Sequence, residues 1–156
     1  YWTGESYLGL GTSAASMLTA PEYDMLAEQN TSLPPRPQEA ARARLVVVDS
    51  PKKIAEGASL FSTEFDVEFL THREAVAEDL MLHARLMEPI SPALLVESEL
   101  VFGASRLQDV LDTCVRDGLL DCVYADVSND AKTYSPTEKG WLLGNELYGR
   151  LWDLRL

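Results

Sequence analysis

The chain is poor in the residues that build metal sites and disulfide frameworks. Its 156 residues include two cysteines, Cys114 and Cys122, and two histidines, His72 and His83. Two cysteines are too few for a disulfide scaffold or a four-sulfur metal site, and their spacing matches no zinc or iron–sulfur pattern. The histidines lie about 16 Å apart along one predicted helix, so they cannot share a metal ion. We therefore expect reduced thiols in the core and no metal centre within this chain.

Basic side chains and long apolar runs are scarce as well. There are 13 Lys and Arg against 25 Asp and Glu, which gives a formal charge of −12. Nucleic acids and anionic membranes require clustered basic side chains, so this balance disfavours both as partners. No apolar run approaches the roughly 18–20 residues that span a bilayer, and no charged-then-apolar leader opens the chain. We expect a cytoplasmic protein without a membrane span and, since the chain opens on Tyr1 instead of Met, a processed or truncated one.

The composition, with 46% hydrophobic residues, is that of a globular protein. The first 65 residues of the chain, however, carry only weak signals for helices and strands. The predicted elements are a strand over 7–11, a turn over 12–16, a helix over 20–29, a strand over 44–49 and a helix over 51–55. Residues 19–43 contain four prolines and are interpreted as a Pro-rich insertion. Residues 1–65 therefore resemble strands of a larger sheet, not a domain that folds alone.

The signals become firmer from residue 66 onward. The predicted elements are helices over 71–88, 91–100 and 104–117, a hairpin of 119–127 with 132–134 about a turn at 128–130, and a last helix over 135–152. Thr71 with Glu74, and Ser135 with Glu138, have capping-box spacing, and Gly118 stands where a helix C-cap is expected. Three helices, a hairpin and a long helix predict a winged-helix-like domain over 66–156. The predicted fold class is α+β.

Charge decides against the use of this winged helix for binding DNA. Residues 104–117, in the position of a recognition helix, hold two basic and three acidic side chains. Phosphates repel such a surface, so a packing or protein-contact role is favoured. Paired carboxylates on the predicted helices are interpreted as solvated faces. Gly140, Gly144 and Gly149 indicate close packing of the last helix or, alternatively, a docking groove on it.

The turn that begins at Gly9-Leu10-Gly11 could offer backbone amides to an anion. A lone Gly-x-Gly lacks the third glycine and the Lys of a phosphate loop. Spacing alone therefore favours a structural turn, in which each glycine answers a demand of the backbone.

Several motifs, taken in order, resemble one family. The matching segments are Tyr1-Trp2, 7–11, Ala14-x-Ser16, 46–57, 78–86, 117–120 and 137–146. The first three resemble the end of the radical SAM half of oxygen-independent coproporphyrinogen III oxidases, a family that includes closely similar heme chaperones. The last three resemble the family's C-terminal domain. Thr12 and Ser13 replace the family's Pro-Gly, and Ala15 replaces its His, so any contact made by that His is missing here.

The resemblance implies that this chain is the C-terminal part of a larger protein, in which residues 1–65 would supply the last strands of a radical SAM partial β/α barrel and residues 66–156 the C-terminal helical domain. The family's Cys-x-x-x-Cys-x-x-Cys signature does not occur in these 156 residues. A [4Fe-4S] cluster and S-adenosylmethionine would therefore belong to a missing N-terminal radical SAM domain. There a 5′-deoxyadenosyl radical would start the oxidative decarboxylation of coproporphyrinogen III, whereas the chaperone branch binds and delivers heme.

The resemblance also implies a role for this fragment. It would help to cover and bind the tetrapyrrole, with no catalytic residue of its own, and would be inert alone. The implied ligand-proximal residues are Tyr1, Trp2, Gly9, Gly11 and Ser13. The alternative is a stand-alone acidic winged-helix module that contacts a protein partner.

Overall fold

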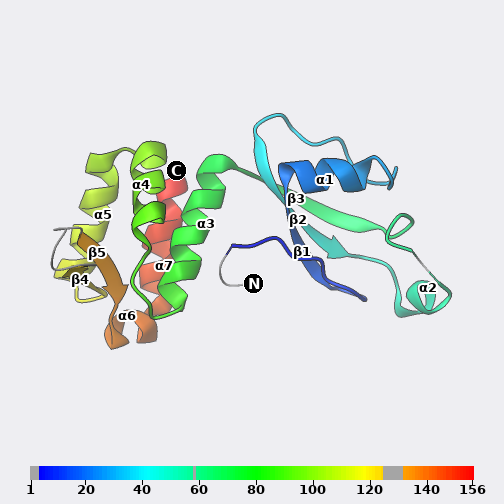
Figure 1. Ribbon diagram of the computed structural model, residues 1–156. Coiled ribbons are helices and arrows are strands. Elements are labelled where there is room, and N and C mark those ends of the chain that lie inside the picture. The colour runs from blue at the N-terminus through cyan, green and yellow to red at the C-terminus, as the bar shows by residue number, and fades with distance from the viewer. Residues whose placement is uncertain (1–3, 58, 125–131) are drawn as a thin grey trace. The chain divides into compact units, whose positions relative to one another are not determined.

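The computed structural model describes residues 4–57, 59–124 and 132–156, which divide into two compact units (Figure 1). The first unit, from Glu5 to His72, contains a three-stranded sheet and two helices. The second, from Arg73 to Leu156, contains the remaining helices and a two-stranded hairpin. The predicted α+β class is confirmed. The predicted division after residue 65 falls at the start of a strand that belongs to the first unit.

The first unit is an antiparallel sheet covered on one face by a helix. The strands β1 (Ala15–Thr19), β2 (Ala40–Val47) and β3 (Phe65–Thr71) lie in the order β1-β2-β3. Leu18, Ala43 and Phe69 are paired in register across them and face helix α1 (Ala20–Ala27). Tyr23 of α1 packs edge-on against Phe69, with 5.1 Å between ring centroids. Successive strand residues alternate between faces, so the same apolar stripe runs across all three strands.

The Pro-rich segment after α1 is fastened to this unit by polar contacts. The Tyr23 hydroxyl donates to the carbonyl of Pro34 at 2.7 Å. The buried Asn30 donates its amide protons to the carbonyls of Leu60 and Thr63 at 3.0 and 2.9 Å. Residues 19–43, predicted as an insertion, therefore include α1 and the start of β2 and contribute to the core of the unit.

Three predictions for the first unit are wrong in detail. Residues 7–11 form no strand, because their ladder is a single bridge between Tyr7 and Met17. The predicted turn over 12–16 ends earlier, because β1 already begins at Ala15. Strand β2 begins at Ala40, four residues before the predicted start. Its two arginines point to the face opposite the core, so they do not interrupt the strand. Strand β3 was not predicted. Helix α2 (Pro51–Ala55) confirms its prediction, and the Ser50 hydroxyl accepts from the Lys53 amide at 3.3 Å.

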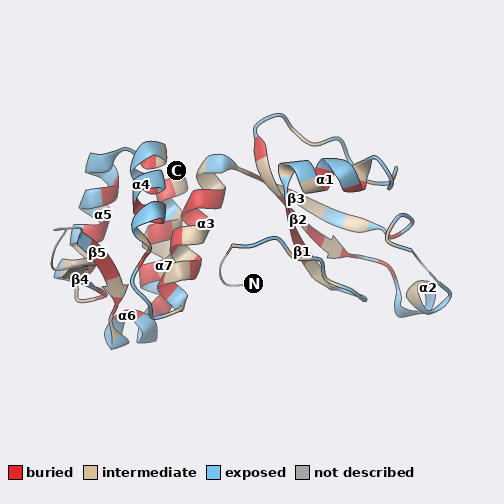
Figure 2. Cartoon of the chain, in the orientation of Figure 1, coloured by how far each residue is buried: buried red, intermediate tan, exposed pale blue. Residues whose placement is uncertain are grey.

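The second unit packs its helices around one apolar core (Figures 1 and 2). Its elements are α3 (His72–Arg85), α4 (Pro92–Phe102), α5 (Ala104–Arg116), β4 (Leu120–Tyr124), β5 (Lys132–Pro136), α6 (Glu138–Leu142), α7 (Gly144–Trp152) and the 3-10 turn η1 (Asp153–Arg155). The hairpin is tied to the segment before α4, because Ile90 donates its amide to the carbonyl of Tyr134 at 2.8 Å. The core includes Leu80, Leu107, Leu119 and Leu147, each at most 2% exposed.

One arginine joins three helix ends of this unit. Arg73 donates to the carbonyls of Val101, Leu154 and Arg155 at 2.8, 2.9 and 2.9 Å. Its guanidinium also stacks on Phe102, 5.0 Å from the ring centroid. Because the last carbonyls of a helix lack partners within that helix, these bonds satisfy the ends of α4 and η1 from the start of α3.

The last predicted helix is in fact two helices. β5 continues through Pro136, so the N-cap is Thr137, whose hydroxyl accepts from the Gly140 amide at 2.9 Å, and not Ser135. The helix is then interrupted at Leu143, and α7 begins at the next residue. The first predicted helix of this unit is shorter than expected, because α3 ends at Arg85. The predicted hairpin is confirmed, whereas its turn at 128–130 lies outside the described residues.

Candidate functional site

The glycine-bearing turn lies against one end of the sheet in the first unit. Tyr7 and Met17 exchange two backbone hydrogen bonds of 2.9 Å, so the segment before the turn runs antiparallel to β1. The turn closes where Ala14 donates to the carbonyl of Gly11 at 3.1 Å. Ser13 then donates to the carbonyl of Val47 at 3.0 Å, which ties the turn to the end of β2.

Glycine is required at positions 9 and 11 for two different structural reasons. A Cβ on Gly9 would lie 2.1 Å from the carbonyl oxygen of Ala15, closer than any side chain permits. The Gly9 amide also donates to the buried hydroxyl of Ser16 at 3.0 Å. Gly11 has open space around it, but its φ of +106° lies where residues with a Cβ are strained. Ser13 has a positive φ of 59° as well, in the left-handed region.

A mostly apolar hollow of about 180 Å³ lies beside this turn. Its lining residues are Gly9, Leu10, Gly11, Val47, Ile54, Leu60, Thr63 and Phe65. Two implied site residues, Gly9 and Gly11, thus lie together at one hollow, whereas Ser13 is not among the lining residues. Tyr1 and Trp2 lie outside the described residues. Leu10 is 85% exposed, so its side chain is available to a ligand at the rim.

A polar cluster that the sequence reasoning missed lies next to Thr63 and Phe65. Lys53 of α2 bonds Asp49 at 2.7 Å and Glu64 at 3.0 Å. The bond from Lys53 lowers the pKa of the buried Asp49 carboxyl, and bonds from Asp49 and then Glu64 raise the pKa of Lys53. Both groups therefore stay charged near neutral pH, which suits an anchor and not proton transfer. The i,i+4 spacing of Asp49 and Lys53 was a readable signal, but Glu64 comes from a separate segment.

Within the part of the chain that the structure describes, the histidines and cysteines are not assembled into a site. His83 lies on α3 with its Nδ1 3.0 Å from the carbonyl oxygen of Asp79. Cys114 is buried, as predicted, and burial raises the pKa of its thiol. Cys122 is exposed, so the prediction that both thiols lie in the core is wrong for it.

Two features that the described residues lack bear on function. Across 4–57, 59–124 and 132–156, no three His, Cys, Asp or Glu side chains are grouped closely enough to hold a metal ion. None of the helices in the described part of the chain is long and apolar enough to cross a bilayer.

Comparison with known proteins assigns no relative to the chain. No family model, no curated protein and no solved structure matches it.

Proposed function

We propose that the chain is the C-terminal part of an oxygen-independent coproporphyrinogen III oxidase-like radical SAM protein and that it helps to bind the tetrapyrrole. The observation that carries the proposal is the turn at Gly9 and Gly11. In the resembling motif both positions are glycine, and here one is required by a close backbone approach and the other by a positive φ. Both line the same apolar hollow, which is the kind of surface that a porphyrin edge prefers.

The second unit supports the proposal through its order of elements. Helices α3 to α5, the β4–β5 hairpin and a helical C-terminus follow the winged-helix-like plan proposed for the C-terminal domain. The glycine turn at 118, expected from the family's Gly-Leu-Leu motif, has a φ of +72° directly after α5.

The proposal places the iron–sulfur cluster outside this chain. Cluster ligation requires cysteine thiolates, and this sequence has two cysteines, one buried on α5 and one exposed on β4. These residues do not fit a [4Fe-4S] cluster, so the proposed N-terminal radical SAM domain would hold it together with S-adenosylmethionine. The role assigned to this chain is to bind and orient the tetrapyrrole. The proposed compartment is the cytoplasm, where free thiols persist.

A porphyrin titration tests the role of the hollow. Coproporphyrin III and hemin are each titrated into the 156-residue chain, and the shift of the Soret band is followed. Leu10→Asp places a charge on an exposed side chain at the rim, and Leu100→Asp on α4, where Leu100 is 83% exposed, is the matched control. We expect Leu10→Asp to weaken binding about tenfold, which is about 1.4 kcal/mol, and Leu100→Asp to leave it unchanged. Absence of binding by the unchanged chain, or equal loss in both variants, would refute the proposed contact.

Experiments on the full-length parent protein distinguish the oxidase branch of the family from the heme-chaperone branch. A parent gene without a three-cysteine motif upstream of Tyr1 would exclude the assignment and leave an acidic interaction module. With such a parent, the full-length protein is incubated anaerobically with a reductant, S-adenosylmethionine and coproporphyrinogen III. Formation of protoporphyrinogen identifies the oxidase, whereas stable heme binding without turnover identifies the chaperone.

A further inference from the structure

Three successive apolar side chains face solvent at the junction of α6 and α7. Trp141, Leu142 and Leu143 are 55%, 67% and 48% exposed. A continuous helix would turn at least one of them inward, but the break at Leu143, with φ −98° and ψ 37°, leaves all three outside. Isolated exposed leucines are ordinary, whereas a contiguous apolar patch of several hundred Å² marks an interaction surface.

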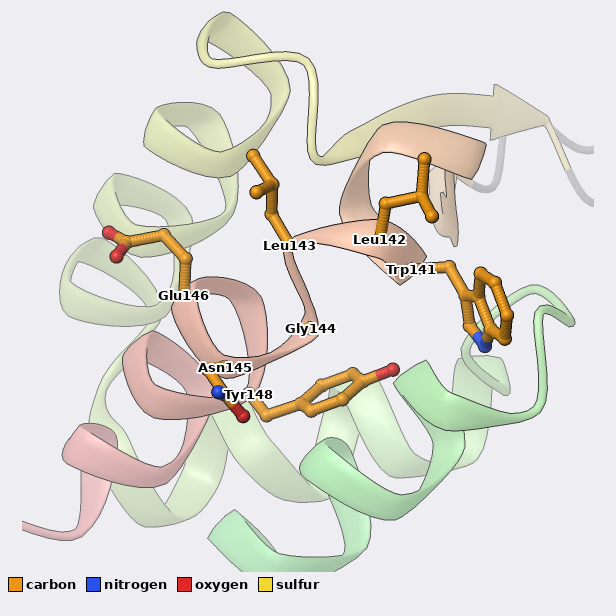
Figure 3. A pocket seen from close by; sticks show the side chains of 7 residues that line it. All are labelled: Trp141, Leu142, Leu143, Gly144, Asn145, Glu146 and Tyr148. Atoms are coloured by element: carbon orange, nitrogen blue, oxygen red, sulfur yellow. The ribbon is translucent and has the colours of Figure 1, made fainter.

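The same junction is hollowed (Figure 3). An open depression of about 570 Å³ is lined by Trp141, Leu142, Leu143, Gly144, Asn145, Glu146 and Tyr148. A second, adjoining depression is lined by Arg85 and Leu86 of the α3 end together with Trp141 and Tyr148. In Figure 3 the Trp141 indole stands at one side of the hollow, and the Tyr148 ring extends across its floor.

The floor of the hollow is held in place by its neighbours. The Arg85 guanidinium lies over the Tyr148 ring at 4.9 Å from the centroid. On the other side the ring packs where Gly144 has no side chain, since a Cβ there would lie 2.4 Å from the ring. Tyr148 therefore needs little reordering when a partner covers it, which favours association.

We propose that this surface, residues 141–148 with Leu86, is the interface of a symmetric dimer of this chain. A two-fold interface places the same patch on both copies, so the patch must hold a protrusion and a recess that fit each other. Here the half-exposed Trp141 indole is the protrusion, and the depression over Leu143 and Tyr148 is the recess. The inference does not depend on the proposed tetrapyrrole role.

The apolar area of the patch is of the size that such a dimer uses. At roughly 200 Å² per large side chain, the exposed fractions of Trp141, Leu142 and Leu143 leave about 350 Å², before the half-buried Leu86 and Tyr148 are added. A standard interface covers about 800 Å² per partner, of which about 450 Å² is apolar. The patch therefore supplies most of the apolar area that a stable dimer needs.

Charge sets the conditions under which the dimer forms. The chain carries a formal charge of −12, so two copies repel each other at long range. Around the patch the signs are mixed: Glu146 lines the first depression and Arg85 the second, Glu138 and Lys139 precede the patch in the chain, and Glu146 is paired with Arg150 at 2.8 Å. Because the attraction is apolar and the repulsion is electrostatic, added salt should strengthen the dimer.

Sedimentation velocity of the whole chain tests the proposal from micromolar to several hundred micromolar. Runs are made at about 0.1 M and about 0.5 M salt, between which the Debye length falls from about 10 Å to about 4 Å. We expect a monomer–dimer equilibrium whose dissociation constant falls at the higher salt. Trp141→Ser and Leu142→Ser should each raise it about tenfold or more. Leu100→Ser on α4 is the control, since it removes a leucine elsewhere on the unit that is even more exposed than Leu142.

Far-ultraviolet circular dichroism of each variant verifies the fold, which these exposed positions should not affect. A monomer at every concentration would overturn the proposal and assign the patch to a different protein. A dimer that survives both patch substitutions, or that Leu100→Ser weakens equally, would also overturn it.

Discussion

Replacing Gly140 by Ala tests how closely α6 packs on the start of the hairpin. A Cβ at this position would lie 2.0 Å from the carbonyl oxygen of Leu119 and 2.9 Å from its carbonyl carbon. The Leu119 carbonyl cannot easily retreat, because it accepts from the amide of Thr137 at 3.1 Å and belongs to a residue that is 1% exposed. The substitution must therefore shift backbone against backbone, which no rotamer change can relieve.

The expected cost follows from two effects. Overpacking a well-filled site costs about 1–3 kcal/mol, and weakening the bond from Thr137 to Leu119 adds about 1 kcal/mol. The higher helix propensity of Ala relative to Gly offsets roughly 1 kcal/mol of this cost. We expect Gly140→Ala to lower the free energy of unfolding of the second unit by about 2 kcal/mol.

Gly149 on α7 provides the control with the opposite sign. A Cβ there would meet nothing within 4 Å, and no positive φ is recorded for this residue. Gly149→Ala should therefore raise the free energy of unfolding by about 0.5–1 kcal/mol, through reduced freedom of the unfolded chain.

Urea unfolding followed by circular dichroism and tryptophan fluorescence measures both effects. With a slope of about 2 kcal/mol per molar, Gly140→Ala should lower the midpoint by about 1 M, and Gly149→Ala should raise it by about 0.3–0.5 M. If both variants shift the midpoint in the same direction, the packing argument is wrong. A Gly140→Ala protein as stable as the unchanged chain would refute it directly.

Three further outcomes are expected. Arg73→Met removes the side chain that donates hydrogen bonds to three backbone carbonyls, so it should destabilise the second unit by about 2–4 kcal/mol in thermal unfolding. A change below about 0.5 kcal/mol would contradict this role of Arg73. The Asp49 carboxyl, whose pKa is lowered by Lys53, contributes stability above its unfolded pKa of about 3.9 that is lost as pH falls through its lower folded value. Asp49→Asn should therefore remove part of the acid sensitivity seen in a pH series of urea midpoints, and an unchanged pH profile would argue against the pair. A thiol reagent should modify Cys122 rapidly and Cys114 only on unfolding, because burial raises the pKa of the Cys114 thiol, and two equally fast thiols would contradict this burial.

Elements whose ends carry local signals were predictable from the sequence. The N-caps at Ser50 and Ser91 accept from amides of the first helical turn, at 3.3 and 3.2 Å. Gly118 closes α5 with a positive φ, and the next amide, that of Leu119, bonds back to Cys114 at 2.8 Å. Such signals depend on residues a few positions apart, so they do not require knowledge of the fold.

Strands were harder to predict from the sequence, because each strand forms only when it pairs with a partner that is distant in the chain. β3 alternates Phe65, Val67 and Phe69 with acidic residues, a pattern that could have been recognised. β1 has no such alternation, because Ser16 and Met17 are both buried within it. The break at Leu143 lacks a proline that would mark it in the sequence.

The site was predictable to a similar degree. Gly9 and Gly11 stood out by residue type, but their separate reasons, a carbonyl at 2.1 Å and a positive φ, appear only in three dimensions. The contribution of Glu64 to the Lys53 cluster was hidden, because it approaches from a segment eleven residues away in the chain.

The buried amide of Asn30 has a consequence for the choice of expression host. Asn30-Thr31-Ser32 has the Asn-x-Ser sequence that secretory-pathway enzymes glycosylate. In the folded chain the Asn30 nitrogen already donates to two carbonyls, and its oxygen accepts from the amide and hydroxyl of Ser32 at 3.0 and 2.6 Å. A glycan added during translocation would occupy that nitrogen before these bonds form, and the loop could no longer close on the sheet. Material secreted from a eukaryotic host would thus separate into unglycosylated, native chains and glycosylated, misfolded ones.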